Sequence, residues 1–330
     1  MDRGGESPLE QLGASSGRGF PHLLSARERT ASGLEARRSR LAELAHDGDT
    51  SVVLMGSWGR AEVTAGSDDD FMVLVNGAER DEVEPSIEAV KTVLDQAPGD
   101  QGVFGEPVFC DNLVGNVGLD RDDNKNLTRR MLFILESVPA TAGDVYAAAR
   151  ERVLRRYLDE SIKDFRPPRF LLNDTVRYWR TICVDFAGKE QAGPEKWGLR
   201  NAKLRTSRKV LFAGGLLPIF ECVNLERAAM FDFLNARFDM PPTDRIAQAF
   251  IDHDASDPGA RALGAYDEFL GLLDDENFRR ELRDVTRATA DESRAFAEVR
   301  RLGADLEAGL LGLLFETEPL SKLVRDYAIF

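Results

Sequence analysis

The stretch that decides the fold is GSWGRAEVTAGSDDDFMVLV, residues 56–75. It follows a short β-branched run and ends in the apolar run 71–75, so it predicts two short strands joined by a glycine-punctuated loop. Asp68, Asp69 and Asp70 stand in a row directly before the second strand. Three adjacent carboxylates at the start of a buried strand repel one another, and this arrangement calls for a counter-charge.

The alternation of side chains along a strand separates the three aspartates. If Asp70 extends the strand backward, Asp68 and Asp70 project to one face and Asp69 to the other. Two carboxylates about 7 Å apart on one face can converge on Mg²⁺, which is often held by one or two carboxylates together with phosphate oxygens and water. The triplet alone is also typical of a solvated turn.

Gly56 and Ser57 supply a second half of the same site. A glycine at a strand end lets the backbone approach a phosphate closely, and a helix that begins at Ser57 would present N–H groups to the anion. Each residue alone is an ordinary turn residue. In this order, and with a strand on either side, the two halves predict a nucleotide–metal site.

The rest of the chain predicts an α+β protein, in which a small mixed sheet is followed by an all-helical part. Residues 1–22 are polar and rich in Gly and Ser, and we expect a disordered lead-in. Residues 23–125 form the sheet-containing domain with an N-terminal helix, and residues 126–330 form the helical domain. Within the first domain the pattern predicts helices over 26–46 and 83–97, and strands over 51–56, 71–75 and 107–110.

Composition limits the classes of partner. The 330 residues carry a net charge of −14, which disfavours long nucleic acids and anionic membranes. Residues 150–209, however, hold 16 Lys and Arg against 8 Asp and Glu, a pattern that indicates a bound anion. The chain has no apolar run long enough for a membrane span and no secretory leader pattern. Its three cysteines are scattered, so we expect free thiols and a cytoplasmic location.

The motif in residues 56–70 also resembles a known signature. G-S-x-G-R-x-E-x(4)-S-D-x-D before an apolar strand is similar to the motif of the DNA polymerase β-type nucleotidyltransferase superfamily. The Gly-Arg-x-Glu variant is most similar to the bacterial branch that includes the PII uridylyltransferases. The matching positions are Gly56, Ser57, Gly59, Arg60, Glu62, Ser67, Asp68 and Asp70.

The resemblance implies roles for these residues. Asp68 and Asp70 become ligands of Mg²⁺, with Mn²⁺ as the alternative cation, and Gly56 and Ser57 become contacts of a triphosphate. In the family a third carboxylate from a later strand activates the attacking hydroxyl. Asp111 is the candidate here, and it could equally cap a helix; the alternative is Glu106.

Further candidates lie in the loop and in the helical part. Arg60 and Ser67 are candidates for nucleotide binding, and Arg60 with Glu62 could instead form a structural pair. The segment KWGLRNAKLR (196–205) loosely resembles the Lys-x-Gly-Leu-Arg-Asp stretch of that branch, with Asn201 in the place of Asp. Arg200 and Lys203 share one helix face there and would meet a triphosphate.

Two more groups in the helical part have alternative readings. Arg129 and Arg130 would reach the triphosphate if the helical part closes over the sheet. Tyr178, Trp179 and Trp197 would stack on a base or belong to the core.

The sequence thus predicts an Mg²⁺-dependent nucleotidyltransferase that moves a nucleoside monophosphate from an NTP such as ATP to a hydroxyl, with release of pyrophosphate. The acceptor is a protein, a small molecule, an RNA end or a second nucleotide, and the acidic charge favours a protein or a small molecule. The alternative is an inactive nucleotide-binding sensor or interaction module on the same fold.

Overall fold

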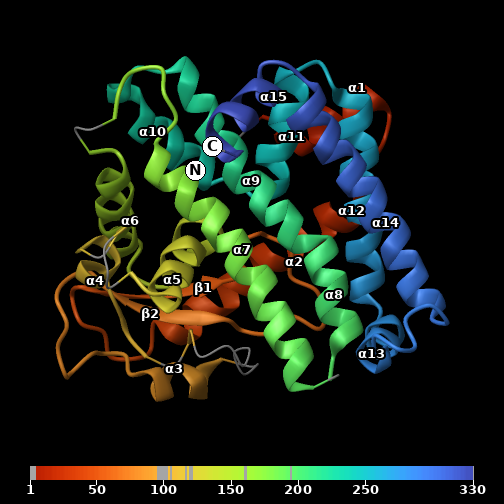
Figure 1. Cartoon of the computed structure of the whole chain (residues 1–330). Coiled ribbons are helices and arrows are strands. Elements are labelled where there is room, and N and C mark those ends of the chain that lie inside the picture. The colour runs from red at the N-terminus through yellow and green to blue at the C-terminus, as the bar shows by residue number, and fades with distance from the viewer. Residues whose placement is uncertain are drawn as a thin grey trace.

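The computed structural model describes residues 5–94, 103–104, 106–115, 117–118, 122–159, 162–193 and 195–329. The protein is mostly helical and contains a small mixed sheet (Figure 1). None of the helices in these ranges combines the length and the apolar character that a membrane crossing requires.

The described strands form one four-stranded sheet in the order β3-β2-β1-β4. They are β1 (Thr50–Met55), β2 (Phe71–Val75), β3 (Val108–Phe109) and β4 (Ser137–Pro139). β1 pairs antiparallel with β2 and β4, whereas β3 runs parallel to β2. The end of β1 therefore lies beside the start of β2, and the loop between them is held at one edge of the sheet.

Each face of the sheet packs against different helices. Val52, Leu54 and Val73 point into a core that also contains residues of α2 (Pro21–Leu41) and α3 (Ile87–Val93). The alternate residues, among them Val53 and Met72, join the larger core of the helical part. The sheet is buried on both faces, which explains why β2 is apolar throughout and β1 is apolar from Val52 to Met55. The larger core is continuous from the sheet into the helices.

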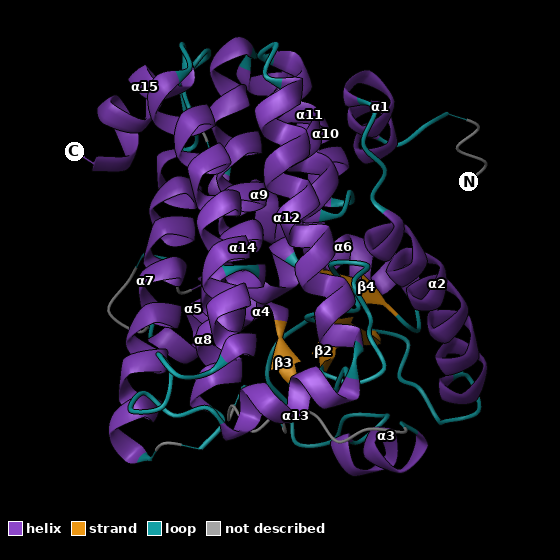
Figure 2. Cartoon of the chain, turned by 90° about the vertical axis from the view of Figure 1, so that its right-hand side faces the viewer, coloured by secondary structure: helices purple, strands orange, loops and turns teal. Residues whose placement is uncertain are grey.

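The remaining helices build the body of the molecule above and beside the sheet (Figures 1 and 2). Those up to the middle of the chain are α1 (Pro8–Ser16), α4 (Cys110–Gly115), α5 (Asn124–Leu135), α6 (Gly143–Tyr157), α7 (Arg169–Ala192), α8 (Trp197–Arg205) and α9 (Ser207–Glu221). Those that follow are the 3₁₀ turn η1 (Cys222–Asn224), α10 (Arg227–Phe238), α11 (Pro242–Asp252), α12 (Ser256–Asp274), α13 (Glu276–Asp284), α14 (Arg294–Leu311) and α15 (Leu320–Leu323), with π-helical turns at η2 (Gly312–Glu316) and η3 (Val324–Ile329).

The prediction of a disordered lead-in is wrong for residues 5–22. Ser7 and Glu10 form a reciprocal capping box at the start of α1, and the Leu9 side chain is fully buried. The Leu9 amide donates to Asp244 at 3.1 Å, and the helix packs against α11 and α12. Apolar burial and capping outweigh the Gly- and Ser-rich composition.

One predicted helix is shorter in the structure, and one strand was not predicted. The helix predicted over 83–97 begins only at Ile87 and ends at Val93, and residues 95–97 lie outside the described ranges. β4 was not predicted, because three residues directly after a helix leave no periodic pattern.

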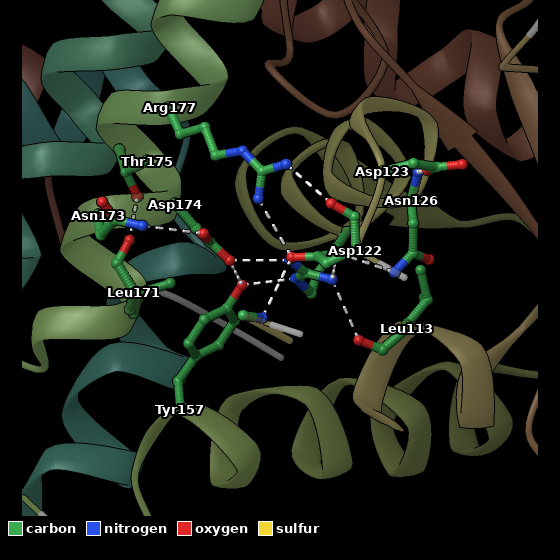
Figure 3. A network of polar contacts seen from close by, with 12 residues as sticks. Leu113, Asp122, Asp123, Asn126, Tyr157, Leu171, Asn173, Asp174, Thr175 and Arg177 are labelled. Atoms are coloured by element: carbon green, nitrogen blue, oxygen red, sulfur yellow. Dashed lines mark hydrogen bonds and ion pairs between the residues drawn. The ribbon is translucent and has the colours of Figure 1, made fainter. Parts of the chain in front are cut away.

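A buried polar network ties α5, α6 and α7 together (Figure 3). The fully buried guanidinium of Arg130 donates to Asp122 at 2.8 Å and to Asp174 at 2.8 Å, and the Tyr157 hydroxyl also donates to Asp174. Arg177 contacts Asp122 from α7. Arg130 is therefore a structural residue and does not meet a triphosphate, contrary to prediction.

Candidate functional site

The loop after β1 is a single helical turn closed by a Schellman motif. The Arg60 amide donates to the Gly56 carbonyl at 3.0 Å, the Glu62 amide to Ser57 at 2.9 Å and the Ala61 amide to Trp58 at 3.2 Å. Ala61 takes the left-handed conformation (φ 57°) that this motif requires. The motif leaves the start of the turn, at Gly56 and Ser57, facing the beginning of β2.

Gly56 and Asp70 are in close contact. Gly56 has φ of +64°, and a β-carbon built on it would lie 3.1 Å from Oδ2 of Asp70. The Met55 amide donates to the Asp70 carbonyl at 2.9 Å, so the β1–β2 ladder continues up to this point. The absence of a side chain on Gly56 thus leaves room for the Asp70 carboxylate.

The three aspartates separate as the alternation argument predicts. Asp70 lies on the same side of β2 as Met72 and faces the helical part, and Asp68 lines the same cavity. Asp69 is fully buried on the opposite side, where Arg37 of α2 donates to its two oxygens at 2.9 and 3.0 Å.

Asp68 and Asp70 face a cavity of about 350 Å³ between the β1–β2 loop and helices α7, α8, α9, α12 and α13. Its lining contains more cations than carboxylates. The cations are Arg60, Lys189, Lys196, Arg200, Lys203, Arg208, Arg279 and Arg283, and the carboxylates are Glu62, Asp68, Asp70 and Asp185. A cavity with this balance suits a polyanion that arrives with a divalent cation.

Some of these cations are already paired. Lys189 pairs with Asp185 at 2.8 Å, and Arg279 donates to backbone carbonyls of Leu273 and Asp274. Within the ranges that the structure describes, no ion pair engages Lys196, Arg200, Lys203 or Arg283. These four have their charge available for a ligand.

Lys203 interacts electrostatically with both Asp68 and Asp70. Lys203 is exposed as a whole, but the protein around its ammonium displaces water and lowers the pKa of Lys203, and the positive charge of Arg208 acts in the same direction. The carboxylates of Asp68 and Asp70 act in the opposite direction and raise that pKa. A polyanion bound between them would favour the charged form of Lys203.

Arg60 and Glu62 form a structural pair, the alternative that the sequence left open. Arg60 donates to Glu62 at 2.8 Å and is also paired with the fully buried Glu136, which precedes β4. Tyr266 of α12 donates to Glu62 at 2.7 Å, and Arg208 of α9 reaches Glu136 at 3.2 Å. This network anchors the loop to the helices, and Arg60 lines the cavity with its charge already neutralised.

Gly59 and Ser67 fix the loop further. A side chain on Gly59 would collide with the backbone between Glu136 and Ser137, so only glycine fits there. Ser67, predicted as a nucleotide contact, lines the cavity, and its hydroxyl accepts from the Thr64 amide at 2.9 Å. It thereby holds the turn that leads into Asp68.

The structure does not bring Asp111 to the cavity. Because β3 is parallel to β2, with Val75 paired to Phe109, Asp111 lies at the far end of β2 from Asp70, and it is paired with Arg152. The alternative, Glu106, is paired with Lys125 at 2.7 Å and does not line the cavity either. Asp111 stands in the first turn of α4.

Asp68 and Asp70 are therefore the two carboxylates available to a cation in the cavity. In the described part of the chain, no group of three or more His, Cys, Asp or Glu side chains is arranged to hold a metal ion. Mg²⁺ is commonly bound by one or two carboxylates while phosphate oxygens complete its coordination, and Asp68 and Asp70 match this kind of site.

Of the predicted aromatic residues, Tyr178 and Trp197 belong to the core, and Trp179 is half-buried beside it. Tyr178 is buried next to Glu136, Trp179 stacks on Phe212 with ring centroids 5.4 Å apart, and Trp197 packs against Phe296. None of these three aromatic residues lines the cavity.

Several cavity residues were not predicted from the sequence. Arg208, Arg279 and Arg283 come from α9 and α13, which carry no motif. Glu136 does not line the cavity but anchors Arg60 and Arg208, and it was not predicted because it precedes a strand of only three residues. The excess of basic residues over 150–209 was the one signal, and it covers Arg208 but not the two arginines of α13. Neither the family models nor the curated proteins compared with the chain give a match.

Proposed function

We propose that the chain is an Mg²⁺-dependent nucleotidyltransferase that transfers a nucleoside monophosphate from an NTP to a hydroxyl group. One observation carries the proposal: Asp68 and Asp70 line the same cavity as the unpaired cations Arg200 and Lys203. Carboxylates for a cation and cations for a polyanion are the two requirements of a metal–triphosphate site.

Each group has a role in this proposal. Asp68 and Asp70 hold the cation, which supplies Lewis-acid stabilisation of the phosphate charge. Arg200 and Lys203 bind the triphosphate, and the turn at Gly56 and Ser57 approaches it through the backbone. The oxygen of the acceptor hydroxyl forms a bond to the α-phosphorus, the bond to pyrophosphate breaks, and the hydroxyl proton leaves to a base.

The domain division predicted from the sequence fits this arrangement. Residues 23–125 supply the carboxylates and the glycine turn, and residues 126–330 supply Arg200 and Lys203 and cover the cavity. We expect a protein or small-molecule acceptor, because the chain charge of −14 disfavours a long nucleic acid.

The alternative is a nucleotide-binding sensor without transfer activity. The position of Asp111 away from the cavity favours it, since no third carboxylate in the described residues joins Asp68 and Asp70.

The two functions are separated by incubating the protein with Mg²⁺, each α-labelled NTP and a cell lysate, followed by mass spectrometry of the labelled products. The enzyme gives pyrophosphate and a covalently labelled acceptor, and both disappear in Asp70→Asn. Mg²⁺-dependent NTP binding without any labelled product identifies the sensor.

A further inference from the structure

The cavity has a second, apolar wall. Apolar side chains from three helices line it beside the cations: Ile182 and Phe186 of α7, Leu199 and Leu204 of α8, and Leu270 and Leu273 of α12. On α8 the lining residues Leu199, Arg200, Lys203 and Leu204 follow the spacing i, i+1, i+4, i+5 of one helix face, and Lys196 directly precedes the helix. This face alternates cationic and apolar side chains, so the cavity is built for a ligand with an anionic part and an apolar part.

Phe186 is the one aromatic side chain among the described residues that line the cavity. It lies four residues after Ile182 and three before Lys189, on the cavity face of α7. Its polar neighbours Asp185 and Lys189 are paired with each other at 2.8 Å, so they leave the ring as an apolar surface.

Phe186 packs against the core with only part of its side chain. From Trp179 to Gln191 no residue of this helix is buried, whereas the preceding part contains buried residues such as Leu171 and Tyr178. Figure 1 shows this C-terminal half of α7 running beside α8 at the edge of the molecule. Phe186 itself is half-buried at the margin of the core.

We propose that Phe186 is the base-stacking residue of the site and that the site prefers purine nucleotides. This inference rests on the proposed function. A flat ring on an apolar wall binds a nucleobase by stacking, which is indifferent to the hydrogen-bonding edge of the base. Because the larger purine covers more of the wall, ATP and GTP bind more tightly than CTP and UTP.

The test compares the affinities of Mg²⁺ complexes of ATP, UTP and inorganic tripolyphosphate, measured by calorimetry. Phe186→Ala should weaken ATP binding about 5- to 150-fold and leave tripolyphosphate binding unchanged. Phe186→Trp should retain ATP affinity. The matched control is Phe170→Ala, on the same helix, where the side chain is 56% exposed and lies outside the cavity.

The outcomes separate this inference from the proposed function. Unchanged ATP affinity in Phe186→Ala, or an equal loss of tripolyphosphate affinity, overturns the role of Phe186. Equal affinities of the wild type for ATP and UTP overturn the purine preference. If the wild type binds tripolyphosphate but Phe186→Ala does not weaken ATP, the metal–phosphate site stands and only the base site is lost. If the wild type binds neither ATP nor tripolyphosphate, the proposed function fails as well.

Discussion

Substitution of Asp69 and of Asp70 should affect different properties, although the two residues are adjacent. In Asp69→Asn the half-buried Arg37 loses the negative charge of Asp69, and at least one of the two hydrogen bonds at 2.9 and 3.0 Å is lost because the amide presents a donor. Breaking a buried ion pair from one side costs about 3–5 kcal/mol.

The lower end of that range applies here. Arg37 also lies over the ring of Trp58, 4.1 Å from the centroid, and donates to the Gly33 carbonyl at 3.3 Å. These contacts remain in Asp69→Asn, so we expect a loss of about 3 kcal/mol in the free energy of unfolding. Asp70→Asn removes a charge that faces the cavity beside Asp68, and we expect a change within about 1 kcal/mol.

The assay is urea unfolding of both variants with and without Mg²⁺ and ATP. A ligand that binds only the folded state at 100 times its Kd adds about 2.7 kcal/mol. Asp69→Asn should start lower and still gain this increment. Asp70→Asn should start near the wild type and gain nothing. The reasoning is refuted if Asp69→Asn is as stable as the wild type, or if Asp70→Asn keeps the increment.

Three further changes test other parts of the site and fold. Gly56→Ala forces an L-residue into a left-handed conformation, which costs about 1–2 kcal/mol, and brings a β-carbon to 3.1 Å from the Asp70 carboxylate. We expect lower stability in urea unfolding and weaker Mg²⁺–ATP binding in calorimetry, and unchanged binding would contradict the contact. Lys203→Met should weaken tripolyphosphate binding about tenfold or more, whereas Lys203→Arg should retain most of it; equal affinities in all three proteins would remove Lys203 from the site. Burial acts to raise the pKa of Asp122, but the hydrogen bonds and charge of Arg130 outweigh burial and lower that pKa. The Asp122–Arg130 pair therefore contributes its full stability above the usual aspartate pKa, and this stability is lost as the pH falls through the lowered pKa. Between pH 5 and pH 2 the stability of Asp122→Asn should therefore fall less than that of the wild type, as followed by thermal unfolding, and parallel curves would count against the pair.

The local part of the site could be predicted from the sequence because its determinants are local. The apolar run 71–75 forms β2 with the predicted bounds, and the alternation along it places Asp69 opposite Asp70. Gly56 is required because it lies against Asp70 where β1 ends and β2 begins. The order of glycine, loop and aspartate in the motif already implies that these two residues are neighbours.

The third carboxylate could not be predicted, because its position depends on strand direction. Asp111 follows a strand, as expected, but β3 runs parallel to β2 and carries the residue to the opposite end of the sheet. An antiparallel β3 would have placed it beside Asp70. Nothing in a two-residue strand encodes this direction.

The cations of α13 and the packing of α1 depend on tertiary contacts as well. Arg279 and Arg283 reach the cavity only because α13 packs against α8 and α12. For α1 a local signal was present, namely Ser7 and Glu10 at capping-box spacing with Pro8 between them, and the composition of the surrounding residues obscured it.

The central claim is that Asp68 and Asp70 bind a cation that binds a triphosphate. The most direct measurement is calorimetric titration of ATP into wild type, Asp68→Asn and Asp70→Asn, each with Mg²⁺ and with EDTA. We predict binding to the wild type that requires Mg²⁺ and that either substitution abolishes. ATP binding that persists in EDTA or in both variants, or no binding to the wild type, would contradict the claim.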